Sequence, residues 1–128
     1  MRAGRALAAA LIAAAGAQAF AAGDAKRGEE VYSRCLACHA LEYDRTGPRH
    51  CGLFGRRAGS VPGFAYSEAM RRSRIIWNDA TLERFIADPL KAVPGTAMGY
   101  AGVKDRRERA DLIAYLHNAN RTACAGVR

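Results

Sequence analysis

The feature that most constrains this chain is the pentapeptide "CLACH", Cys35-Leu36-Ala37-Cys38-His39. Two cysteines separated by two residues, with a histidine directly after the second, are typical of covalent haem attachment. On one helical turn both thiols can reach the two vinyl groups of a haem, while the next residue points its imidazole at the iron. The motif therefore predicts one covalently bound haem c, with thioether bonds from Cys35 and Cys38 and His39 as an axial iron ligand.

The same pentapeptide is compatible with two other chemistries. A zinc site would need two more ligands, and the candidates are His50, Cys51, His117 and Cys124, but none lies in a second paired cluster with zinc-finger spacing. A redox dithiol would need a strand–helix–strand setting, which the sequence lacks. Haem attachment is favoured over both.

The N-terminal stretch "MRAGRALAAALIAAAGAQAFAA" has the layout of a secretory signal peptide. Arg2 and Arg5 precede an apolar run, and small residues suited to cleavage follow. We expect residues 1–21 to be cleaved and residues 22–128 to form a single domain in the periplasm. A retained membrane anchor is the alternative, but the run is shorter than the ~20 apolar residues that span a bilayer. Stable membrane insertion is therefore not expected.

Export changes how charge and cysteines are interpreted. Without the two leader arginines the chain keeps 18 basic and 12 acidic residues, so it stays basic. No basic helix interleaved with aromatic residues is visible, and an exported protein rarely meets nucleic acid. An acidic protein partner or an anionic membrane surface is the better expectation. In an oxidising compartment the four cysteines should be paired or otherwise chemically used.

Capping residues and apolar spacing predict an all-α chain. The expected helices run from Asp24 to about Cys35, from Asp79 to Asp88, and onward from Asp105. Residues 40–66 are broken repeatedly by glycine and proline, and a loop this long is uncommon unless it wraps a ligand. A large apolar cofactor would complete the core that these helices alone would lack.

The sixth iron ligand decides what such a protein can do. Met98, in "PGTAMGYAG", offers a soft thioether that stabilises ferrous iron, and saturated iron cannot readily bind oxygen or peroxide. Met98 therefore indicates electron transfer without a substrate. Met70 and His50 are the alternative sixth ligands. Iron left five-coordinate would instead indicate an enzyme or a gas-binding protein.

Several segments, in order, resemble the class I c-type cytochromes, especially the group containing mitochondrial cytochrome c and its soluble bacterial relatives. They are "CLACH", "TGP", "GLFGRRAG", "PGFAYSEA", "IIW", "TLERFIADP", "VPGTAMGYAGV" and "ERADLIAYL". The resemblance runs from Asp24 to Asn120. It implies the class I cytochrome c fold, in which the N- and C-terminal helices cross and long loops wrap around one covalent haem.

The resemblance also implies residue roles. Met98 would be the distal ligand, and Pro48 would supply the carbonyl that orients His39. Residues that bind a haem propionate or line the pocket would be Arg56, Tyr66, Trp77 and Thr96. Gly28 and Tyr32 would meet the final helix at Leu112 and Tyr115. Phe85, Met70 and His50 depart from the family pattern, so no reduction potential is assigned by analogy.

A disulfide is expected between Cys51 and Cys124. Cys51 has no haem role, and the resemblance places the loop that contains it near the end of the final helix, just before Cys124. Exported free thiols are disfavoured.

The resulting hypothesis is a monomeric, periplasmic one-electron carrier that is not an enzyme. Its partners would dock transiently at a basic haem-edge face, and could be a membrane cytochrome bc complex, a terminal oxidase, a reaction centre or a dehydrogenase. Candidate residues of that face are Arg34, Arg45, Lys91 and Lys104 for charge, and Ala37, Ala97 and Tyr100 for an apolar patch.

Overall fold

The computed structural model describes residues 22–127, and this part of the chain is helical without a β-strand. In chain order the elements are α1 (Ala25–Tyr32), the 3₁₀ turn η1 (Ser33–Cys35), α2 (Glu68–Arg72), α3 (Asp79–Ala87), α4 (Pro89–Ala92) and α5 (Arg106–Arg121). The all-α prediction is confirmed. The expected signal peptide, residues 1–21, lies outside the described residues.

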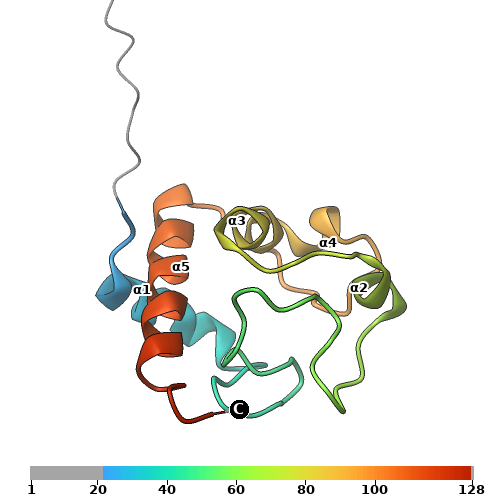
Figure 1. Ribbon diagram of the computed structural model, residues 1–128. Helices are drawn as coiled ribbons and strands as arrows, with labels where there is room; N and C mark the ends of the chain where they lie inside the picture. The colour runs from blue at the N-terminus through green and yellow to red at the C-terminus, as the bar shows by residue number, and fades with distance from the viewer. Residues whose placement is uncertain (1–21, 128) are drawn as a thin grey trace, which may run out of the picture.

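The terminal helices α1 and α5 pack across each other, as Figure 1 shows. α1 begins after Asp24, whose carboxylate accepts the Arg27 N–H at 2.9 Å. α5 begins after Asp105, whose carboxylate accepts the Glu108 N–H at 2.9 Å. Both starts follow from side-chain caps that satisfy free N–H groups of the first turn.

Close approach at the α1–α5 crossing depends on Gly28. A β carbon there would overlap the carbonyl oxygen of Asp111 and lie 2.7 Å from the Cβ of Tyr115. The ring of Tyr32 packs on that of Tyr115 with centroids 5.0 Å apart. The predicted crossing is present, although the glycine faces Asp111 rather than Leu112.

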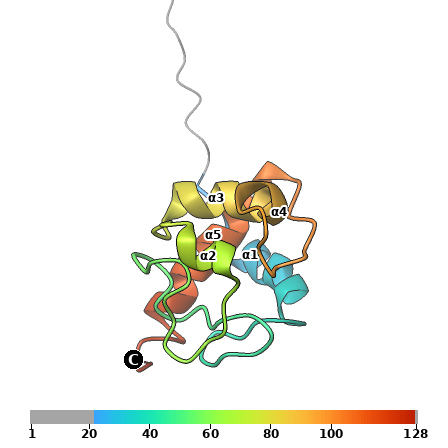
Figure 2. The same cartoon turned by 90° about the vertical axis from the view of Figure 1, so that its right-hand side faces the viewer.

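α3 and α4 lie at one end of the molecule, and the loop from Leu36 to Ser67 lies at the other end (Figures 1 and 2). Asn78 and Thr81 form a reciprocal capping box that opens α3. Pro89 does more than end that helix, since it is the first residue of α4 and Asp88 caps the new helix. Proline suits a first helical position because its fixed φ is already helical.

The core is one buried cluster to which α1, α2, α3, α5 and the loops all contribute. Its larger members include Tyr32, Leu53, Met70, Trp77, Leu82, Phe85, Ile113 and Leu116. α2 was not predicted, because five residues are too few to show a helical period. The helices thus hold the long loop and the segment after α4 around a shared interior.

Candidate functional site

The "CLACH" motif forms a tight turn at the end of α1. The N–H groups of Cys38 and His39 both donate to the carbonyl oxygen of Cys35, at 3.1 and 2.9 Å. Cys35 is half-buried and Cys38 exposed, and neither thiol is paired with another cysteine. The turn therefore presents two free thiols followed by an imidazole, which suits attachment of one planar cofactor.

His39 is buried and held by hydrogen bonding and close packing. Its Nδ1 donates to the carbonyl oxygen of Pro48 at 2.8 Å. A β carbon at Gly47 would overlap the ring, so the loop passes directly against it. Burial lowers the pKa of His39, which favours the neutral ring. With the proton on Nδ1, the lone pair is on Nε2, where a metal ion could bind.

Arg56 indicates that an anionic group belongs in the interior. Its guanidinium is half-buried, and its two terminal nitrogens donate to the carbonyl oxygens of Cys51 and Arg49 at 3.1 and 2.9 Å. No carboxylate within residues 22–127 forms an ion pair with it, and burial lowers its pKa. A half-buried cation that has no ion-pair partner is costly, so a haem propionate would fit this position.

Two aromatic residues predicted for the pocket lie in or against the buried core. The hydroxyl oxygen of Tyr66 accepts the Val61 N–H at 3.2 Å, which leaves its own hydrogen free to donate. Trp77 is 7% exposed and packs on Phe85 with ring centroids 5.1 Å apart.

The Met98 segment is ordered by local bonds. Thr96 is buried, and its hydroxyl oxygen accepts the Met98 N–H at 3.2 Å. Met98 is partly buried and packs against the core cluster, whereas Met70 lies inside that cluster on α2. Both methionines are therefore in contact with the interior.

His50 lies beside His39 rather than opposite it. The two imidazoles are stacked with centroids 4.3 Å apart and planes inclined by 21°. Nδ1 of His50 is hydrogen-bonded to the hydroxyl of Tyr32 at 2.9 Å. Ligands on opposite sides of one metal ion cannot be stacked face to face, so the structure argues against His50 as the sixth ligand.

Cys51 and Cys124 are both buried, and their Cα atoms lie 5.3 Å apart. This separation lies within the range that a disulfide bridges.

The predicted basic face is partly occupied by internal contacts. Arg34 forms a two-pronged ion pair with Glu108, at 2.6 and 2.8 Å. Arg45 donates to the carbonyl of Leu36, and Lys104 to that of Ala87. Ala37, Ala97 and Tyr100 are all exposed, and so is Leu36 within the motif itself, which sequence analysis did not include.

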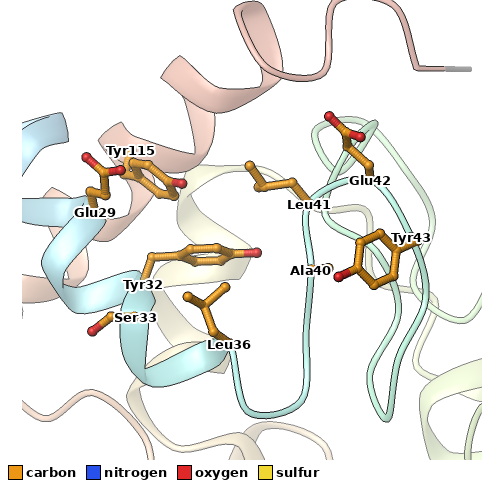
Figure 3. Close-up of a pocket in the computed structure, with 9 residues that line it drawn as sticks. All are labelled: Glu29, Tyr32, Ser33, Leu36, Ala40, Leu41, Glu42, Tyr43 and Tyr115. Atoms are coloured by element: carbon orange, nitrogen blue, oxygen red, sulfur yellow. The ribbon is translucent and has the colours of Figure 1, made fainter.

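A surface groove of about 470 Å³ lies between α1, α5 and the loop around Leu41 (Figure 3), and no sequence pattern predicted it. Its lining includes Tyr32, Tyr43 and Tyr115, with Glu29 and Glu42 among the other residues. These residues come from three separate segments, so no local pattern could have revealed the groove.

Comparison with known proteins decides the family. The family model described as "Cytochrome c" matches residues 25–120. The chain belongs to the cytochrome c family. Its relatives include cytochrome c2 of Blastochloris viridis, 45% identical over 103 residues that cover 78% of this chain and 81% of the relative. Cytochrome c of Euglena viridis is 44% identical over 97 residues, covering 73% and 95%.

Among solved structures, cytochrome cH from Methylobacterium extorquens superposes on this cytochrome c with a TM-score of 0.73 at 41% identity. The match covers 75% of this chain and 99% of that chain. The resemblance and the class I fold are thus confirmed. As a cytochrome c, the protein has one covalent haem c and acts as a monohaem electron carrier. Within residues 22–127, no helix is both long and apolar enough to cross a membrane.

Proposed function

We propose that this cytochrome c is a periplasmic one-electron carrier that acts on no substrate. Cys35 and Cys38 would form the thioethers to the haem, and His39 and Met98 would hold its iron. The observation that carries this proposal is the bond from Nδ1 of His39 to the Pro48 carbonyl, because it leaves Nε2 for iron. The haem, when bound, supplies an Fe(III)/Fe(II) couple.

The protein side chains would set the properties of that couple. The Pro48 carbonyl fixes Nδ1 of His39, and the backbone at Gly47 passes against the edge of the ring. The Met98 thioether favours ferrous iron and closes the sixth position. Propionates would be bound or bordered by Arg56, Tyr66, Trp77 and Thr96. These residues exclude water and fix the cofactor, so little rearrangement accompanies electron transfer.

Partners would dock transiently on the monomer where the cofactor edge reaches the surface. The exposed residues Leu36, Ala37, Ala97 and Tyr100 supply an apolar contact. Lys91 is exposed and supplies positive charge. A membrane cytochrome bc complex, a terminal oxidase, a reaction centre or a dehydrogenase would fit this weak, electrostatically steered encounter.

Export and the second cysteine pair belong to the same proposal. Residues 1–21 would direct the chain to the periplasm and be removed there. That oxidising compartment would allow Cys51 and Cys124 to form a disulfide, which their Cα separation of 5.3 Å accommodates.

The test is the optical spectrum of the oxidised protein matured with haem in a periplasm. A methionine sulfur on ferric iron gives a weak far-red band. We expect this band in the native protein, its loss in Met98→Ala and its survival in Met70→Ala. Absence of the band in the native protein, together with rapid carbon monoxide binding after reduction, would contradict the proposal and favour a catalytic or gas-binding haem.

A further inference from the structure

We propose that His50 is a positioning residue for His39, and that Tyr32 and the C-terminal end of α5 hold it in place. This inference rests on the proposed function, because it concerns His39 as an iron ligand. The Pro48 carbonyl fixes one ring atom of His39. His50 would fix the plane of that ring, and the two contacts together would determine how the imidazole is rotated.

The contact between the two imidazoles is flat and close. Their centroids are 4.3 Å apart and their planes are inclined by only 21°. A planar neighbour at this distance restricts rotation of His39 about its Cβ–Cγ bond, because turning either ring would drive its edge into the other. A flexible aliphatic side chain at position 50 would restrict this rotation less.

Tyr32 holds the His50 ring. The hydroxyl of Tyr32 is 2.9 Å from Nδ1 of His50, and Tyr32 is 3% exposed in the α1–α5 crossing. Figure 3 shows its side chain reaching from α1 toward the loop at Ala40. The Tyr32 hydroxyl can donate its hydrogen to Nδ1 of His50 when that nitrogen carries no proton. The ring of His50 is therefore held in one orientation.

The backbone at His50 is held by α5. The side-chain amide of Asn120 donates to the carbonyl oxygen of His50 at 3.2 Å and accepts the Gly52 N–H at 2.8 Å. The His50 N–H donates to the Leu41 carbonyl at 3.1 Å. The Cα of the next residue, Cys51, lies 5.3 Å from that of Cys124, just beyond α5. These contacts connect the C-terminal helix to the ring that packs on His39.

The experiment uses the haem-containing protein and three substitutions. His50→Leu removes the flat ring, and Tyr32→Phe removes the hydroxyl that holds it. The matched control is His117→Leu. It removes another stacked histidine, whose ring centroid lies 3.6 Å from that of Phe54 and which does not touch His39. Ferric proteins are compared by electron paramagnetic resonance g values and by haem-methyl proton shifts. Both report the orientation of the axial imidazole.

We expect both signals to shift in His50→Leu and, less strongly and in the same direction, in Tyr32→Phe. They should stay unchanged in His117→Leu. If His50→Leu binds haem and its signals match the native protein, His50 is a packing residue and the inference is wrong. If His50→Leu cannot be matured with haem, Tyr32→Phe decides: shifted signals support the inference, and signals that match the native protein contradict it. Failure of the proposed function is distinguishable from failure of this inference. If Met98 does not bind the iron, the native protein itself lacks the far-red band.

Discussion

Gly28 of α1 lies against the main-chain carbonyl of Asp111 in α5, with no room for a β carbon between the two helices. At this point the terminal helices meet backbone to backbone, and a side chain at position 28 would separate them.

Gly28→Ala should destabilise the protein. Alanine gains roughly 1 kcal/mol of helix propensity over glycine, but overpacking in a rigid core costs about 1–3 kcal/mol or more. We expect a net loss of up to about 2 kcal/mol in the free energy of unfolding, measured by denaturant titration. Gly126→Ala is the control, because a β carbon at Gly126 meets nothing within 4 Å. Equal stability of both variants would contradict the close contact.

Asp111 should contribute to the acid sensitivity of the fold. Its carboxylate accepts N–H groups from Arg27 at 2.9 and 3.1 Å and from Asp24 at 2.6 Å. The Arg27 side chain holds the pKa of Asp111 below its usual value. The stabilisation is therefore complete above the unfolded pKa of about 4, and disappears as the pH falls through the lower folded pKa.

Asp111→Asn tests this expectation. Unfolding free energies measured from about pH 5 to pH 2 should fall more steeply for the native protein, so that the two curves converge in acid. Glu42→Gln is the control, because this exposed carboxylate has no hydrogen-bond partner among residues 22–127. Parallel curves for the native protein and Asp111→Asn would show that Asp111 is not the group responsible.

Arg74 has a left-handed backbone, with φ of 57°. This conformation costs an ordinary residue about 1–2 kcal/mol. Glycine adopts it without strain, but glycine loses more conformational entropy on folding. Arg74→Gly should therefore raise the free energy of unfolding by about 0.5–1 kcal/mol. Arg72→Gly in α2 should instead lower it, since its backbone is helical. A loss of stability in Arg74→Gly would show that its side chain contributes more than its backbone costs.

Replacing Cys51 and Cys124 by serine should lower stability. A cross-link over 73 residues would stabilise by up to about 4 kcal/mol in the chain-entropy model, and by less here because the attached haem already restricts the unfolded chain. A reductant should bring the native protein to the level of the double variant and leave the variant unchanged. Two reactive thiols in the unfolded, oxidised holoprotein would contradict the disulfide.

Features that depend on a few neighbouring residues were predictable from the sequence. The spacing within "CLACH" places two thiols and an imidazole on one turn, and Asp24, Asn78 and Asp105 cap helices because their side chains reach N–H groups only a few residues ahead. The class I fold was also correct, although it came from the resemblance of several segments and not from periodicity alone. Short elements such as α2 and α4 carried too little pattern to be seen.

Tertiary structure decided how these local features are combined. The sequence determined that His39 follows two thiols, and the family resemblance had predicted the Pro48 carbonyl beside it, but only packing put His50 against its face and Gly47 at its edge. It also made Asp111 the neighbour of Gly28, and it fixed the contacts that the segment around Cys51 makes with the end of α5, a proximity that the resemblance had predicted. Contacts of this kind join residues that are distant in sequence, and their geometry exists only once the helices have crossed and the long loop has closed over them.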